Sequence, residues 1–227
     1  MPQIAVIDLI SDVAQVCREA PTTTLVSAYI RAVRRFCQRS HWFRASLPGV
    51  TQANVQQYSL GSDVYNEIIG VRAVSLDDGS GSETARTALT DSNSGTWDSN
   101  LGASVGNLPE LYQYVPEGQI ALHPTPAGAY NLRVTLILQP KRGSNSIDDT
   151  LPVKWGYAFD AGALAYLLDL PRVPWIDKVT ARARELEFLA ATNSARSSAE
   201  RGYNAGAATT SRMARPSGAL HTRILPI

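Results

Sequence analysis

Lysine is almost absent from this chain. Only three of its 21 basic residues are lysines, and the rest are arginines, the cation that is favoured at protein–protein interfaces. With 20 acidic residues the formal net charge is only +1. A nucleic-acid-binding protein would more often carry a clear basic excess. The composition therefore favours contacts with protein over contacts with DNA, although a ring of arginines facing DNA in an assembly stays open.

Cysteine and histidine are scarce as well. Cys17 and Cys37 are the only cysteines, and each falls on an apolar helical face, which is typical of small buried thiols rather than of a disulfide. The histidines at positions 41, 123 and 221 have no cysteine or carboxylate at metal-ligand spacing. We therefore expect no metal site and no cofactor.

Membrane spans, secretion signals and catalytic motifs are also missing. No apolar run has the length that spans a bilayer, and the first residues lack the basic start of a signal peptide. We expect a protein that is made in a cytoplasm and has no membrane partner. No phosphate-binding loop or nucleophile elbow has the required spacing. Asp148 and Asp149 fit a solvated turn, and Cys37 with His41 lacks an orienting carboxylate. We therefore expect that the protein is not an enzyme.

Apolar periodicity predicts two helices near each end of the chain. Residues 6–18 and 24–42 carry apolar side chains at helical spacing, and Pro21 separates the two segments. Near the other end, helices are predicted over residues 153–168 and 175–199. In the last of them the side chains expected to be buried are Ile176, Val179, Ala183, Leu186 and Leu189 or Ala190.

The middle of the chain has the pattern of strands. Short segments bounded by Gly, Pro, Asp and Ser occupy residues 50–60, 67–76, 111–115, 119–123 and 130–138. No helical pattern interrupts them, which predicts an antiparallel sheet or a small sandwich. The loop over residues 91–106 is rich in Ser, Asn and Gly and carries Trp97, a candidate interface anchor.

The predicted architecture is α+β. A helical bundle is formed from N- and C-terminal helix pairs, an antiparallel β domain is inserted between them, and an extended C-terminal arm follows. The predicted boundaries are 1–46 for the N-terminal helices, 47–150 for the β domain, 151–201 for the C-terminal helices and 202–227 for the arm. The arm lacks periodicity and cannot fold alone, yet its last residues are apolar, as in a segment that docks on a partner.

The second helix carries many arginines and few acidic partners. This pattern is typical of a solvated helix face or of a subunit contact. The candidate subunit or portal-binding residues are Arg31, Arg34, Arg35, Arg39, Trp97, Arg212, Arg215, Arg223, Ile224, Leu225 and Ile227.

The order of these elements, together with several segments, resembles a known family. The segments cover residues 122–126, 130–135, 138–140, 150–155, 162–168 and 175–177, and a closing helix that contains Glu187 and Phe188. In this order they resemble the head-to-tail adaptor (connector) proteins of tailed double-stranded DNA bacteriophages. The resemblance covers roughly residues 1–200 and is strongest over residues 122–191.

The resemblance implies a virion structural protein in the neck between head and tail. Such a protein forms a ring, usually a dodecamer, that closes the neck and helps to retain packaged DNA. Its implied partners are further copies of itself, the portal protein and tail or nozzle proteins, with tail fibres an open addition and channel DNA at most a non-specific one. Another neck or tail-completion protein is the nearest alternative, and a DNA-binding packaging accessory protein is a more distant one.

Overall fold

The structure is a computed structural model that describes residues 2–61, 64–77, 86–91, 105–106, 108–115 and 118–213. The helical elements are η1 (Val6–Asp8), α1 (Ser11–Val16), α2 (Thr22–Ser40), α3 (Thr150–Leu168) and α4 (Lys178–Met213). The strands are β1 (Gln3–Ala5), β2 (Arg44–Val50), β3 (Gln57–Ser59), β4 (Asn66–Asp77), β5 (Arg86–Ala88), β6 (Thr90–Asp91), β7 (Val105–Gly106), β8 (Leu111–Val115), β9 (Gln119–His123), β10 (Thr125–Pro126), β11 (Asn131–Pro140) and β12 (Ser146–Asp148). The α+β class predicted from the sequence is confirmed.

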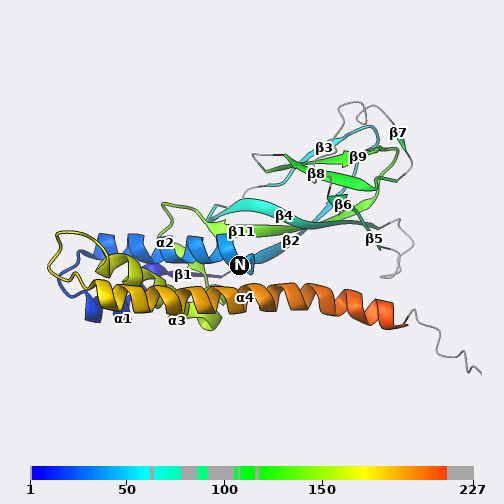
Figure 1. The fold of residues 1–227 in the computed structure, drawn as a ribbon. Helices are drawn as coiled ribbons and strands as arrows, with labels where there is room; N and C mark the ends of the chain where they lie inside the picture. Colours follow the sequence, from blue (N-terminus) through cyan, green and yellow to red (C-terminus); the bar gives the residue numbers. More distant parts are fainter. Residues whose placement is uncertain are drawn as a thin grey trace, which may run out of the picture.

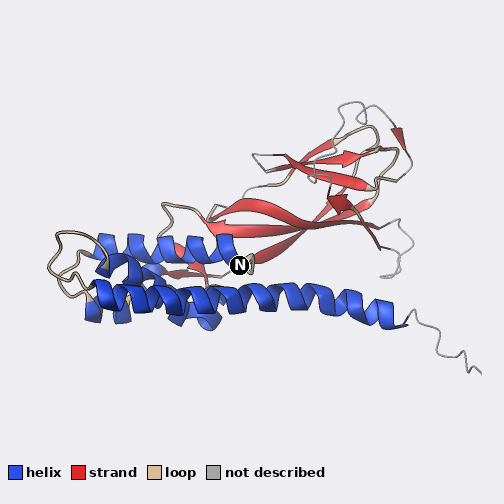
Figure 2. Ribbon diagram, viewed as in Figure 1, coloured by secondary structure: helices blue, strands red, loops and turns tan. Residues whose placement is uncertain are grey.

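The helices lie together on one side of the molecule, and most strands lie on the other (Figures 1 and 2). Helix α3 packs against both α2 and α4, and α2 also contacts α4. Helix α3 buries most of its second half and much of its first, because many of its residues are apolar, several of them alanine. A helix with so many apolar residues is typical of the interior of a protein, although Val153 and Tyr157 stay exposed near its beginning.

Aromatic rings fill the contact between α2 and α3. The ring centroids of Phe36 and Phe159 lie 5.2 Å apart in a T-shaped pair, and those of Tyr29 and Phe159 lie 6.0 Å apart. Trp155 completes the cluster at 5.4 Å from Phe36. Edge-to-face pairs of this kind stabilise a core beyond the area they bury. The apolar stripe predicted for the second helix is thus mostly buried, as expected.

Two four-stranded sheets form the β region. The first has the order β2-β11-β4-β5 and lies beside the helices, because its central strand β11 packs against α2. The second has the order β3-β9-β8-β6 and lies farther from them (Figure 1). Most pairs are antiparallel, as predicted, but the two-residue pairs β6–β8 and β10–β7 are parallel. The predicted strand over residues 50–60 is wrong, because a turn at Asn54, where φ is +63°, separates β2 from β3.

The N-terminal segment differs from the continuous helix that was predicted over residues 6–18. Val6, Ile10, Val13 and Cys17 are buried at helical spacing, which explains the prediction. The backbone nevertheless breaks, because Val6 N–H donates to Asn145 O and Leu9 N–H donates to Val6 O in a short 3-10 turn. Ahead of this turn, β1 pairs with β12, so that Gln3 lies opposite Asp148.

Helix α4 begins and ends later than predicted. It begins at Lys178 because Asp177 caps it, accepting hydrogen bonds from the Val179 and Thr180 N–H groups at 3.1 Å each. It continues to Met213 instead of ending near Ala199. The first part of the predicted arm is therefore helical, and residues 214–227 lie outside the described residues. The division of the chain into four segments stays a prediction.

Candidate functional site

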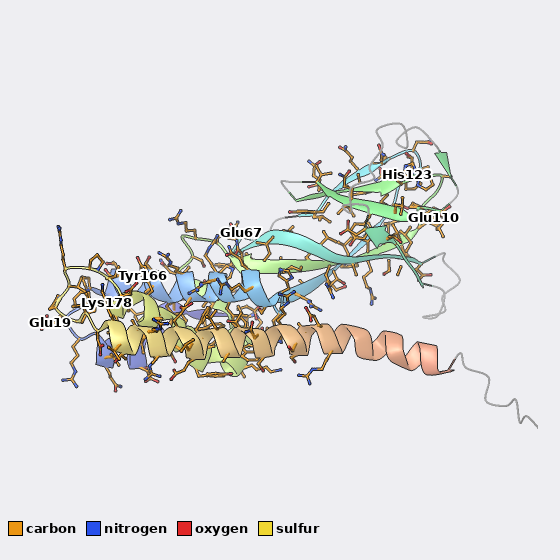
Figure 3. The ribbon with its side chains drawn as sticks, viewed as in Figure 1. Glu19, Glu67, Glu110, His123, Tyr166 and Lys178 are labelled. Atoms are coloured by element: carbon orange, nitrogen blue, oxygen red, sulfur yellow. The ribbon has the colours of Figure 1, made fainter. Side chains whose placement is uncertain are left out.

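Arg34 joins the helices to the first sheet. Its guanidinium donates to Pro140 O at 2.7 Å and forms an ion pair with Glu67 at 2.7 Å. Pro140 ends β11 and Glu67 lies in β4, at the place where the sheet meets the helices (Figure 3). One planar fork thus contacts two strands, which is a role that a lysine cannot reproduce.

Arg35 and Arg31 lie on the side of α2 that faces α4. Arg35 forms a two-pronged ion pair with Glu185 of α4, and one of its hydrogen bonds measures 2.7 Å. The Arg35 guanidinium also lies 5.1 Å from the centre of the Phe188 ring. Arg31 is exposed, and its guanidinium stacks over the Tyr166 ring at 4.3 Å from the centroid. Cation–π contacts of this kind hold an arginine in place without neutralising it.

These two arginines border a hollow of about 460 Å³ between α2, α3 and α4. Its charged side chains are four cations and two carboxylates: Arg31, Arg35, Lys178, Arg182, Asp169 and Glu185. Figure 3 shows Tyr166 and Lys178 at the same end of the helices. We call the residues that line this hollow, together with Val179 and Leu186 on the adjoining surface of α4, the basic face.

The outer surface of α4 contradicts the stripe that the sequence predicted. Val179 is 83% exposed and Leu186 is 62% exposed, and Ile176, Ala183 and Ala190 are exposed with them, whereas Leu189 is half-buried against the core. The residues that α4 buries are Ala181, Phe188, Ala191, Thr192 and Ala195. Phe188 decides the orientation of the helix, because its ring fits against Gly162 of α3, where a Cβ atom would lie only 2.7 Å from the ring.

A second outer surface, which the sequence analysis missed, runs along α3. Val153 is 86% exposed and Tyr157 is 62% exposed. Asp149 precedes them by one turn, and Asp160 follows by one turn. Between them Gly156 borders open space, since a Cβ atom there would meet nothing within 4 Å. A spacing of four and three residues along the predicted helix was the signal that could have located this surface.

Asp160 differs from the other residues of this surface because its carboxyl group is partly buried. Burial raises its pKa to about 6, and the nearby charge of Asp12 in α1 adds to the shift. Its Oδ1 atom is buried and has no hydrogen-bond partner among the described residues. We call Asp149, Val153, Gly156, Tyr157 and Asp160, together with Asp12, the acidic face.

The two cysteine thiols are buried, whereas His41 is partly exposed. Burial raises the pKa of the Cys17 and Cys37 thiols. His41 ends α2 with φ at +51°, and its backbone N–H donates to Cys37 O at 3.0 Å. Burial lowers the pKa of His41, and Arg196, Arg72 and Arg44 act in the same direction. Cys37 and His41 therefore meet through a helix cap, with the thiol protonated and buried.

The described part of the chain contains neither a cluster of metal-binding side chains nor a helix suited to a membrane. No three histidine, cysteine, aspartate or glutamate side chains gather there in a way that could hold a metal ion. No helix among those residues combines the length and the apolar character that crossing a bilayer requires.

The sequence-predicted interface residues do not all come together. Arg31 and Arg35 share the basic face, whereas Arg34 contacts the sheet and Arg39 is exposed in the last turn of α2. Arg212 falls within α4. Trp97, Arg215, Arg223, Ile224, Leu225 and Ile227 lie outside the described residues. Their role as interface residues stays a prediction.

Comparison with known proteins identifies the family. The family model described as SU10 adaptor protein matches residues 4–219, which include all four α-helices and both four-stranded sheets. The chain belongs to the SU10 adaptor protein family. A comparison with curated proteins gave no match. As an SU10 adaptor the chain is a structural adaptor protein of a phage, a component of the virion that interacts with other virion components. The resemblance drawn from the sequence is thus confirmed at the level of the family.

Proposed function

We propose that this SU10 adaptor forms the head-to-tail adaptor ring between portal and tail. In this position it closes the neck of the particle and helps to retain packaged DNA. The observation that carries the proposal is the family match over residues 4–219, because it includes the helices, the β region and most of the segment beyond residue 201. The twelvefold copy number is part of the proposal and rests on the resemblance to connector proteins.

The exposed surfaces of the helices support a role in assembly. Val153 and Val179 are more than four-fifths exposed, and they lie on different helices. Each has a second exposed apolar side chain on the same helix, Tyr157 one turn from Val153 and Leu186 two turns from Val179, and grouped apolar side chains at the surface are typical of sites that bind another protein. Among the described residues, the charged side chains lining the hollow form a surface for binding, and their arrangement gives no nucleophile with an adjacent base.

We propose in addition that residues 202–227 form an arm that docks on the portal or on a neighbouring subunit. Ala195 is the last residue of α4 that the structure describes as buried. Arg44 Nη1 donates to Ala199 O at 3.4 Å, so the described contacts between α4 and the sheet end near this point. A deletion of residues 202–227 should therefore remove the arm and leave the packing of α2, α3 and α4 in place.

The first experiment measures the mass of the purified chain alone and mixed with its cognate portal, by native mass spectrometry. We expect a monomer that becomes a portal-bound ring. The variant that lacks residues 202–227 should lose portal binding while keeping the thermal unfolding midpoint of the full chain. That midpoint serves as the control for folding.

Two outcomes would contradict the proposal. A chain that ignores the portal at every concentration would favour another neck or tail-completion role. A chain that binds DNA tightly, with an affinity that falls steeply as salt rises, would favour a packaging accessory protein, since such a slope reports displaced counterions.

A further inference from the structure

The helical side of the molecule has two outer faces that lie on opposite sides of α3. Tyr157 belongs to the acidic face and Tyr166 to the basic face, and the two are nine residues apart. At about 3.6 residues per turn this separation equals roughly two and a half turns, which places them on opposite sides of the helix. A contact made by one face therefore leaves the other face free for a second contact.

The basic face combines positive charge with exposed apolar side chains. Arg31, Lys178 and Arg182 line the hollow together with the Arg35–Glu185 ion pair. The charges of that pair cancel. Of the remaining charged side chains in the lining, three are cations and one, Asp169, is a carboxylate, so the face has a net positive charge. Leu186 follows Arg182 by four residues and Val179 precedes Arg182 by three, so by helical spacing both exposed apolar side chains lie next to Arg182 on the outer surface of α4.

The acidic face has the opposite charge and the same apolar character. Asp149 and Asp160 stand at its two ends on α3, with Val153 and Tyr157 between them. Asp12 of α1 adds a further carboxylate close to Asp160. The neighbouring cation Lys154 points to the side, where its ammonium lies 5.5 Å and 5.6 Å from the centres of the Trp42 and Trp155 rings.

We propose that successive copies of this chain pack with the basic face of one copy against the acidic face of the next. The inference rests on the proposed function, in which many copies surround one channel, and it names the two surfaces that meet. Like charges oppose the contact of either face with itself, and opposite charges favour the contact between the two faces. A contact between unlike surfaces is heterologous, and it closes into a ring when the rotation between copies allows it.

The open space at Gly156 fits this contact. Because a Cβ atom at this position would meet nothing within 4 Å beyond the backbone of its own helix, the acidic face is open at Gly156, between Val153 and Tyr157 in the sequence. Leu186 or Val179 of the next copy supplies a side chain of suitable size and character. Burial of these four apolar side chains then adds a contribution that salt does not weaken.

Charge reversal tests the pairing. In the first variant, Arg31→Glu and Arg182→Glu make both faces acidic. In the second variant, Asp12→Arg and Asp149→Arg make both faces basic; Asp149 makes no side-chain cap bond that this change would break. For each variant alone, we expect the apparent affinity between copies to fall at least tenfold. The loss should be seen both in portal-bound rings and in concentrated solution.

An equal mixture of the two variants is the decisive sample. Every acidic face can then meet a basic face on a copy of the other kind, so assembly should recover, with alternating composition visible by native mass spectrometry. The matched control is Arg133→Glu, which reverses an exposed charge on β11 and should assemble like the unchanged chain. Circular dichroism and unfolding midpoints check that every variant is folded.

A steric variant gives a second, independent test. Gly156→Gln places a longer polar side chain in this open space, and glutamine favours a helix more than glycine does, so the monomer should be no less stable. We expect assembly to be lost. Gly143→Gln is its control, because a Cβ atom at Gly143 also meets nothing within 4 Å, and that residue belongs to neither face.

The outcomes separate this inference from the proposed function. If the chain forms portal-bound rings and the charge-reversed variants do so equally well, the pairing of faces is wrong and the adaptor ring stands. If the chain ignores the portal but self-associates, and the mixture restores what each variant loses, the pairing stands and the placement at the portal is wrong. Loss in the first variant without rescue would mean that the basic face binds the portal, which overturns the pairing. A chain that never associates overturns both.

Discussion

Two glycines of α3 lie in opposite environments and offer a matched pair of substitutions. A Cβ atom at Gly162 would lie 2.7 Å and 2.9 Å from atoms of the Phe188 ring and 3.0 Å from the Ala32 Cβ atom. Phe188 is fully buried, so a shift of its ring would disturb the packing around it. We expect Gly162→Ala to lower the free energy of unfolding by about 1–3 kcal/mol through overpacking, measured by urea denaturation.

Gly156→Ala is the control for that prediction. It changes the same helix and the same residue type where nothing lies near the new methyl group. Alanine stabilises an open helical position relative to glycine by about 1 kcal/mol. If both variants were stabilised, the close packing of α3 against α4 at Phe188 would be wrong.

The carboxyl group of Asp160 makes stability depend on pH. Its pKa is raised from the ordinary value of 3.8 to about 6, mainly by burial and then by the charge of Asp12. Between about pH 4 and pH 6 the folded chain therefore binds more protons at this site than the unfolded chain, so acidification over that range stabilises the fold.

Asp160→Asn should remove this dependence. We expect the variant to be more stable than the unchanged chain at pH 8 and the difference to shrink towards pH 4, measured by urea denaturation at several pH values. Asp12→Asn should act in the same direction more weakly, since it removes the smaller of the two causes. Equal pH profiles for the unchanged chain and Asp160→Asn would exclude a raised pKa at this position.

The ion pair between Arg35 and Glu185 should contribute more than the other pairs of α4. Its side chains are 37% and 30% exposed, compared with 61% and 48% for Arg196 and Glu200. A double-mutant cycle with Arg35→Gln and Glu185→Gln should give a coupling of about 1 kcal/mol, against about 0.3–0.5 kcal/mol for the exposed pair. A cycle in which the exposed pair gives the larger coupling would contradict the two-pronged geometry.

At the scale of the element, strands with clear turn signals were predictable. The strands β8 and β9 have the bounds expected from the sequence, 111–115 and 119–123, because the turn-favouring sequence Pro-Glu-Gly separates two alternating segments. The strands β1 and β12 were missed. Each is three residues long, which is too short for a periodic pattern, and their pairing depends on residues far apart in the chain.

The orientation of α4 could not be predicted from periodicity because two of its faces are apolar. Val179, Ala183 and Leu186 form one stripe, and Ala181 and Phe188 lie on the opposite side. Burial falls on the second face, where the Phe188 ring lies directly against Gly162 of α3. That complementarity belongs to two helices at once, so neither helix shows it alone.

The acidic partners of Arg34 and Arg35 in α2 could not be predicted from the sequence either. Glu67 is 33 residues from Arg34, and Glu185 is 150 residues from Arg35. The sequence located the arginines off the apolar stripe, which the structure agrees with, but a search for acidic partners within the helix could not find them.

At the scale of the whole molecule, Arg34 holds the helices and the first sheet in one arrangement. Its side chain is 19% exposed, and it bonds both β4 and β11. We expect Arg34→Gln to lower the free energy of unfolding by about 2 kcal/mol, since bonds from a charged group are lost and Glu67 loses its ion pair. Amide hydrogen exchange should rise in β4 and in the last residues of β11.

Arg39→Gln is the control for this variant, because Arg39 is exposed in the last turn of the same helix. It should change the free energy of unfolding by less than about 0.5 kcal/mol. Faster exchange spread evenly over the molecule, in place of exchange focused on β4 and β11, would contradict the bridging role of Arg34.

The pairing of β1 with β12 also governs when the protein can fold during synthesis. Gln3 leaves the ribosome about 145 residues before its partner Asp148, a delay of roughly 7–30 s at ordinary elongation rates. Helices α3 and α4, which cover the apolar side of α2, follow later still. The strands of both sheets are therefore synthesised before the helices that cover α2. During that time the apolar side of α2 is exposed in the nascent chain, and this N-terminal segment is the part that should need chaperones for longest.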